Sequence, residues 1–162
     1  MPHSDFLDRM VDFLRAIGLP VEERKLPDTV FLPGVSIERG VLVFDAEKLR
    51  YPGDLLHEAG HLAVIPKAER VTLTENAGGD GGLEMAAIAW SYAAIVHLNL
   101  PVEILFHQNG YKGETDTLRE NFANGRYIGV PILEWRGMTN YQQRATSMGE
   151  AGYPVMKKWL CD

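Results

Sequence analysis

The N-terminal part of the chain alternates apolar and polar positions with the spacing of an α-helix. Its apolar side chains recur every three or four residues, at Phe6, Leu7, Met10, Val11, Phe13, Leu14 and Ile17. Ser4 precedes this stretch as a candidate helix cap, and Gly18 and Pro20 follow it as helix-ending residues. The pattern predicts a surface helix with one face turned to the core.

Two stretches near residue 40 alternate with a period of two. VSIE and VLVF flank a turn at Arg39–Gly40, which predicts a β-hairpin over residues 35–44. The edge of a strand can pair with an extended peptide. The hairpin is therefore a candidate surface for substrate, with a purely packing role as the alternative.

Weaker patterns predict the remaining elements, and residues 21–34 are expected to be mostly loop. The expected strands are Thr29–Leu32, Val71–Thr74 and residues 126–133, the last at a sheet edge because it contains Pro131. The expected short helices are Pro101–His107 and Thr115–Ala123. Aromatic anchors are expected in the C-terminal third, at Trp135, Tyr141 and Trp159.

Two longer stretches are apolar on almost every side. Tyr51–Pro66 reads YPGDLLHEAGHLAVIP and predicts a helix that starts near Asp54 and stops at Pro66. Leu83–Leu100 predicts a second helix, which must be buried because it is apolar all round. Gly60 costs about 1 kcal/mol inside a helix, which indicates that another element packs closely against it.

Helices combined with a small sheet predict a single α+β domain over residues 1–162. The formal charge of −6 and the lack of a Lys/Arg cluster argue against a nucleic-acid partner. No apolar run has the length of a membrane span, and the N-terminus does not resemble a secretion signal, so we expect a soluble, cytoplasmic protein without a membrane partner. The single cysteine, Cys161, excludes an internal disulfide and a cysteine-rich zinc site.

The first apolar stretch contains HEAGH, three titratable residues where burial is costly. On a helix, His57 and His61 lie one turn apart on one face, within reach of one metal ion. Imidazole nitrogen suits Zn²⁺ well. Glu58 projects about 100° away, where it can reach a metal-bound water. The motif predicts a zinc site with a general base; the alternative is a buried histidine pair satisfied by hydrogen bonds.

This stretch resembles the active-site helix of the zincin metallopeptidases. The resemblance implies that His57 and His61 bind zinc, that Glu58 activates water, and that a sheet with the hairpin packs over this helix. It covers the motif helix and its surroundings. The extended metzincin pattern is absent, because Val64 and Lys67 stand where that pattern has glycine and histidine.

Glu84 is the candidate third metal ligand. It lies 23 residues after His61, in the first turn of the second apolar helix, where the helix dipole favours an ionised carboxylate. The glutamate class of zincins (gluzincins, thermolysin-like) takes its third ligand from a downstream helix, so the resemblance implies this role for Glu84. Ile88 stands where those proteins orient a histidine with an aspartate, so that support must come from elsewhere. HEAGH also occurs in membrane-bound AAA proteases, whose third ligand is an aspartate, and Asp80 and Asp116 are the corresponding alternatives.

Several other polar features have weaker links to such a site. The glycine-rich residues 77–82 are not a phosphate loop, because Glu84 replaces the third glycine and Asp80 would repel phosphate. His97 falls nearly opposite Glu84 and is expected to be a core or helix-end histidine. Zincins stabilise the oxyanion with a Tyr, His or Arg outside the motif. The residues of suitable type are Tyr92, His107, Tyr111, Arg126 and Tyr127.

Together these features predict a zinc-dependent hydrolase, most simply a metallopeptidase acting on a peptide or protein substrate. Zn²⁺ would be held by His57, His61 and Glu84. One alternative is a zincin-like domain that binds metal but acts in regulation or protein interaction. A second is a hydrolase of non-peptide amides. An enzyme requires Glu58 and an open metal position, whereas a structural site has a fourth protein ligand.

Overall fold

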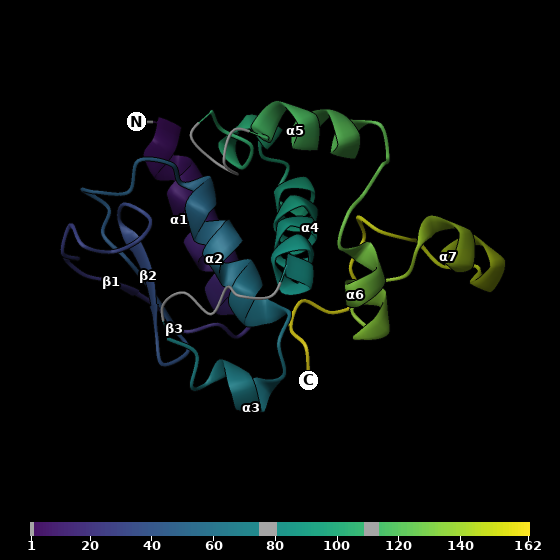
Figure 1. Cartoon of the computed structure of the whole chain (residues 1–162), viewed down its shortest axis with the longest axis horizontal. Helices are drawn as coiled ribbons and strands as arrows, with labels where there is room; N and C mark the ends of the chain where they lie inside the picture. Colours follow the sequence, from purple (N-terminus) through teal and green to yellow (C-terminus); the bar gives the residue numbers. More distant parts are fainter. Residues whose placement is uncertain (1, 75–80, 109–113) are drawn as a thin grey trace.

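The computed structural model describes residues 2–74, 81–108 and 114–162 (Figure 1). Over these residues the chain has seven α-helices, one 3-10 helix and a three-stranded sheet, which confirms the expected α+β class. The elements are α1 (Pro2–Ala16), β1 (Val21–Glu23), β2 (Val35–Glu38), β3 (Val41–Phe44), α2 (Gly53–Ala63), α3 (Lys67–Arg70), α4 (Gly81–His97), η1 (Val102–Ile104), α5 (Thr115–Ala123), α6 (Val130–Trp135) and α7 (Gln142–Met148). Among these helices, none is both long enough and apolar enough to cross a membrane.

β3 is the central strand of the sheet, with β1 parallel on one side and β2 antiparallel on the other. The predicted hairpin is confirmed. Its turn is formed by Arg39 and Gly40, with φ of 46° and 79°, the positive values that a two-residue hairpin turn requires. Ile37 and Leu42 pair across the hairpin and are buried. Both hairpin strands contact α2, and β2 is an edge strand.

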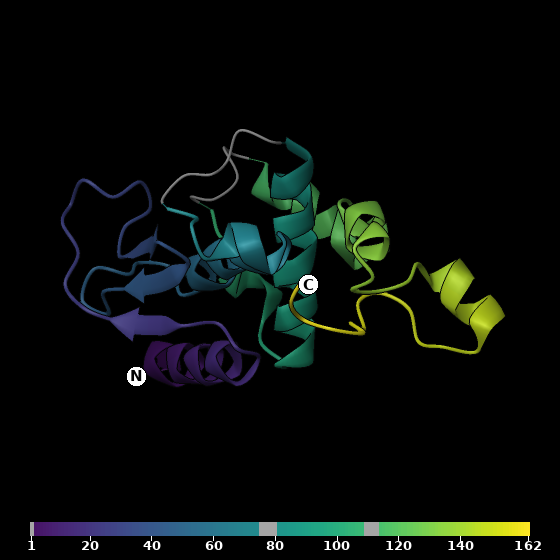
Figure 2. The same ribbon diagram turned by 90° about the horizontal axis from the view of Figure 1, so that it is seen from below.

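α2 and α4 lie side by side at the centre of the molecule, with the sheet beyond α2 and α6 beyond α4 (Figures 1 and 2). The predicted close contact at Gly60 is confirmed, because an added Cβ there would lie 2.7 Å from the Ala87 carbonyl oxygen. Ser91 donates across the same contact to the Leu56 carbonyl at 3.1 Å. Small residues on both helices therefore let the two backbones approach closely.

Segments distant in the sequence hold both ends of α2. At its start, an added Cβ on Gly53 would lie 2.0 Å from the Ile104 carbonyl oxygen, so η1 is packed directly against this turn. Beyond its end, the buried Arg70 donates to the carbonyls of Leu62 at 2.9 Å and Cys161 at 2.5 Å. The guanidinium thus satisfies a carbonyl that the helix end leaves unpaired and ties the C-terminal segment to α2.

The predicted strand at residues 126–133 is wrong. Gly129 adopts a left-handed conformation with φ of 78°, and α6 begins at the next residue, Val130. Pro131 lies in the first turn of this helix, where its missing N–H leaves no intrahelical hydrogen bond unmade. A short apolar run has no period long enough to separate a strand from one turn of helix.

Two shorter predicted strands are also wrong. Val71–Thr74 forms a turn after α3, and within Thr29–Leu32 only Leu32 makes a bridge, to Val35. Conversely, the sequence pattern did not predict β1, α3 or α7. Each is short, and β1 buries only Val21. Such elements lack the apolar repeat from which a prediction could be made.

The predicted helices α1, α2, α4 and α5 are confirmed, although α1 begins at Pro2, before the proposed cap Ser4. Two predicted anchors are wrong, because Trp135 and Tyr141 are 81% and 38% exposed. Trp159 does pack against the core, with its ring edge-on to Phe13 at 5.0 Å. Its backbone carbonyl accepts a hydrogen bond from Trp90 Nε1 at 2.8 Å.

Candidate metal centre

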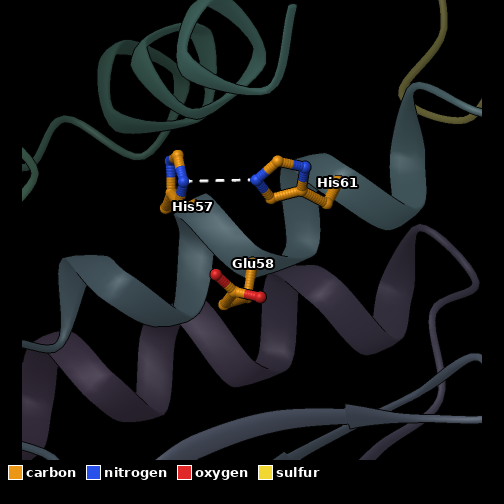
Figure 3. Close-up of side chains that lie close together, drawn as sticks. All are labelled: His57, Glu58 and His61. Carbon is orange, nitrogen blue, oxygen red and sulfur yellow. Dashed lines mark hydrogen bonds between the residues drawn. The ribbon is translucent and has the colours of Figure 1, made fainter. Parts of the chain in front are cut away.

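Two imidazole rings face each other on one side of α2. His57 and His61 are one helical turn apart, and their Nε2 atoms are separated by 3.3 Å (Figure 3). The rings are nearly perpendicular, at 87°, with centroids 4.9 Å apart. Both side chains are largely buried. The helical spacing of the motif thus brings two ligand-type nitrogens to one point.

α4 brings a carboxylate to this pair. Oε1 of Glu84 lies 3.1 Å from Nε2 of His57, and Oε2 lies 2.8 Å from Nε2 of His61. The predicted position of Glu84, in the first turn of the second apolar helix, is confirmed. The close contact between α2 and α4 at Gly60 sets the distance between the helices that carry these groups. The role of Glu84 as a metal ligand stays a prediction.

The spacing of these atoms fits a zinc ion. For Zn–N bonds of about 2.0–2.1 Å and tetrahedral angles, two ligand nitrogens lie about 3.3 Å apart. The Nε2 atoms of His57 and His61 have this separation, 3.3 Å. The Glu84 oxygens lie slightly closer, at hydrogen-bonding distance. Two histidines and one glutamate, with a fourth position open, make up one class of catalytic zinc site.

Hydrogen bonds with the two histidines stabilise the negative charge of Glu84. Hydrogen bonds from His57 and then His61 hold the pKa of Glu84 well below its usual range. Burial lowers the pKa of His57, but the hydrogen bond with Glu84 and its charge outweigh this effect, and the pKa is raised overall. The site therefore favours a positive charge between these side chains. A metal ion that bound there would displace a proton.

Glu58 leaves α2 on a different side from the imidazoles (Figure 3). One of its ligand atoms and one from each of His57 and His61 lie within 4.8 Å of one another. Burial raises the pKa of Glu58, and the charges of the two histidines offset this only in part. A carboxylate with a raised pKa is a stronger base, which suits a group that accepts a proton from water.

Asp80 and Asp116 are the alternative candidates for the third metal ligand. Asp80 lies outside the described residues. Asp116 is in the first turn of α5, where its side chain is 90% exposed and pairs with Arg119 at 2.8 Å. Within the described part of the chain, the carboxylate in contact with both histidine nitrogens is that of Glu84.

The five candidates for oxyanion stabilisation have different surroundings. Tyr92 and Tyr127 belong to an aromatic cluster, with ring centroids 6.1 Å apart, and burial raises the pKa of Tyr92. Arg126 makes its hydrogen bond on an exposed surface. Tyr111 lies outside the described residues. His107 differs from the other described candidates because its side chain bonds to a residue of α2.

The partner of His107 is Asp54, which the sequence analysis treated only as a residue near the start of the helix. Nε2 of His107 lies 2.8 Å from Oδ1 of Asp54, and the two side chains are only 10% and 13% exposed. The Tyr51 ring stacks on His107 with centroids 3.8 Å apart. Asp54 precedes His57 by three residues, and this spacing, which places both on one helix face, is the signal for Asp54 in the sequence.

Other surface features are separate from this centre. His97 is exposed in the last turn of α4, with its ring centroid 5.5 Å from that of Phe13, which agrees with a helix-end histidine. Two surface hollows, of about 390 and 490 Å³, share Tyr141 as a lining residue and lie along the C-terminal third. Neither is lined by His57, Glu58, His61 or Glu84.

Comparison with known proteins assigns no relative to the chain. No protein family, curated protein sequence or solved structure matches it.

Proposed function

We propose that this chain is a zinc-dependent hydrolase of the zincin kind, most simply a metallopeptidase. The observation that carries the proposal is the convergence of three ligand-type groups from two helices. The Nε2 atoms of His57 and His61 are 3.3 Å apart, and the Glu84 oxygens lie 3.1 and 2.8 Å from them. Imidazole and carboxylate together suit Zn²⁺.

Each residue has a distinct part in the proposed reaction. A bound Zn²⁺ would lower the pKa of water to about 7 and polarise the scissile carbonyl. Glu58 accepts the proton of the attacking water and delivers it to the leaving amine, a general acid–base role worth about 10²–10⁴-fold. Its buried position supports this role, because burial raises its pKa. The histidines and Glu84 would hold the metal, which would polarise water and the scissile carbonyl.

An extended substrate could pair with the edge strand β2 only if the groups that cover it moved, because Val35, Ser36 and Ile37 are 2%, 4% and 2% exposed. β2 is an edge strand of the sheet and contacts α2, the helix that carries the motif. A peptide added to such an edge would form main-chain hydrogen bonds without strong sequence preference.

The first experiment measures bound metal by elemental analysis, in protein purified without chelators or a histidine tag. We expect about one zinc per chain, lost in His61→Ala and retained in His97→Ala, which removes an exposed histidine. Wild-type protein that neither contains zinc nor takes it up would refute the proposal.

The second experiment assays a quenched peptide library and a set of small amides. Glu58→Gln should retain zinc and lose hydrolysis by about 10²–10⁴-fold, while Glu69→Gln, an exposed glutamate in α3, should behave as wild type. Undiminished turnover in Glu58→Gln would exclude Glu58 as the base. Zinc binding without turnover of either substrate class would favour a silent metal-binding domain, and turnover of small amides alone would remove the peptidase assignment.

A further inference from the structure

Exposed apolar side chains gather on the C-terminal third of the chain. Of the eight exposed large hydrophobic residues in the described part of the chain, four lie between residues 135 and 155: Trp135, Tyr141, Met148 and Val155. Exposed apolar residues that stand singly are ordinary on a protein surface, whereas a contiguous group marks an interaction site. Trp135, Tyr141 and Met148 line one hollow, of about 490 Å³. These three side chains therefore form such a group.

A second hollow, of about 390 Å³, shares Tyr141 with the first. Its lining includes Arg126, Tyr127 and Tyr153. The helices α6 and α7 lie beyond α4, on the side away from the sheet, and α7 projects from the rest of the molecule (Figures 1 and 2). The residues that line the two hollows are termed the C-terminal surface below.

Hydrogen bonds hold the C-terminal surface in shape. The backbone N–H of Tyr141 donates to Glu134 Oε2 at 2.8 Å, which joins the start of α7 to α6. Nε2 of Gln142 donates to the backbone carbonyl of Tyr153 at 3.1 Å, which joins α7 to the segment that follows it. A preformed surface loses less conformational freedom when a partner binds. Both hollows therefore exist before any partner is present.

The charge of the C-terminal surface is mainly positive. Arg126, Arg144 and Lys157 are exposed lining residues, and Glu134 is the acidic one. Glu134 lies 3.6 Å from Arg144, so its charge is already partly compensated. Residues 126–162 carry five Lys or Arg against three Asp or Glu, whereas residues 1–125 carry 11 against 19. In an acidic chain, this surface thus has the charge that attracts an acidic partner.

The size of the C-terminal surface indicates how much of a partner it can hold. The two hollows are lined by 14 residues, with Tyr141 in both. A stable interface between two folded proteins takes about 20–30 residues from each side. The hollows therefore fit a short segment with a few anchoring side chains better than they fit a folded domain or a second copy of the chain.

We propose that the C-terminal surface binds a short acidic segment of a partner protein. An apolar side chain of this segment lies against Trp135 and Met148, and its carboxylates face Arg126 and Lys157. Tryptophan anchors supply much of the affinity of such contacts, and the charges select the partner and speed its approach. The proposal is independent of the zinc site, because no residue of the candidate metal centre lines either hollow.

The test titrates the protein into a panel of short fluorescein-labelled peptides that differ in the order of glutamate, phenylalanine and leucine, and it measures fluorescence anisotropy. We expect members of the panel to bind, and binding to weaken as salt is added, because exposed charges are screened. One control panel has lysine for each glutamate, and another has serine for each apolar residue; both should fail to bind. The proposal is wrong if no acidic peptide binds or if the lysine panel binds equally well.

Two variants place the peptide on the C-terminal surface. Trp135→Ala should weaken binding by about tenfold or more, and the fold should tolerate it because Trp135 is so exposed. Lys157→Glu should weaken binding by about 2- to 5-fold at low salt, as expected for an exposed charge. The matched controls are Phe31→Ala, another exposed aromatic residue, and Lys67→Glu, an exposed lysine of α3. Unchanged binding in Trp135→Ala would overturn the proposal.

Two further measurements exclude the other occupants. His61→Ala, which lacks a candidate zinc ligand, should bind the peptides as wild type does, so a failure of the zinc proposal leaves this one intact. Binding that is lost in His61→Ala and kept in Trp135→Ala would place the peptide at the metal centre instead. Sedimentation should show a monomer, whereas a dimer that Trp135→Ala dissociates would assign the surface to a second copy and overturn the proposal.

Discussion

Gly60→Ala tests whether the contact between α2 and α4 sets the geometry of the metal centre. The new Cβ would lie 2.7 Å from the Ala87 carbonyl oxygen and 3.2 Å from Ser91 Oγ, whereas ordinary contact begins at 3.4 Å. The nearer neighbour is backbone and cannot rotate away, so the two helices must separate by several tenths of an ångström. Glu84 is carried by α4 and the histidines by α2, so their contacts lengthen with that separation.

The expected magnitude follows from two opposing effects. Overpacking costs about 1–3 kcal/mol, and the better helix preference of alanine returns about 1 kcal/mol. We expect a net loss of about 0–2 kcal/mol in the free energy of unfolding. For a chain of this size the corresponding fall in Tm is at most about 8 °C. Zinc affinity should fall by about tenfold or more, as it does when the support of a metal site is disturbed.

Urea unfolding and competition with a zinc chelator measure the two quantities. Gly81→Ala is the matched control, because Gly81 is also in a helix and an added Cβ there would meet nothing within 4 Å. We expect this control to gain up to about 1 kcal/mol of stability from the better helix preference of alanine and to keep wild-type zinc affinity. If Gly60→Ala were as stable as the control and bound zinc equally well, the reasoning from helix contact to site geometry would be wrong.

Two further predictions concern single carboxylates. Glu84→Ala should lower zinc affinity by about 100-fold or more, since losing a ligand costs at least as much as losing a group that supports one. Asp116→Asn should leave zinc affinity unchanged. The reverse result in competition with a chelator would assign the third ligand to Asp116. Backbone hydrogen bonds, first from Leu26 and then from Glu47, hold the pKa of Asp45 below its usual value of 3.8. Because its pKa is lowered in the folded state, ionised Asp45 stabilises the fold above pH 3.8, and this stabilisation is lost as the pH falls through the folded-state pKa. Asp45→Asn should therefore flatten the acid side of the curve of unfolding free energy against pH. An unchanged slope would contradict this assignment.

The fold was predictable from sequence where an element is long enough to show its own period. α1 displays the helical repeat from Phe6 to Leu14, and the β2–β3 hairpin has strict alternation around a turn that needs Gly40. α6 was predicted as a strand, because a run of about six residues carries no period and Pro131 fits both a strand edge and a helix start. β1 was missed for a related reason, since only Val21 of its three residues is buried.

In the candidate site, too, local sequence determines some features and tertiary contacts determine the others. The sequence by itself determined the pairing of His57 and His61, because their spacing on one helix is a local property. It also indicated Glu84, but only as a charge at the start of an apolar helix, with two aspartates as alternatives. The contact of Glu84 with the histidines depends on how closely α2 and α4 approach at Gly60.

Only the tertiary structure decided the surroundings of the pair. His107 is 53 residues from Asp54 in the chain, and no local pattern links them. They meet because η1 packs against Gly53 and the ring of Tyr51 stacks on the imidazole. Helical periodicity fixes which residues share a face, whereas contacts between distant segments depend on side-chain packing throughout the core. The two histidines of the candidate metal site could therefore be proposed from five consecutive residues, but the contact between Asp54 and His107 could not.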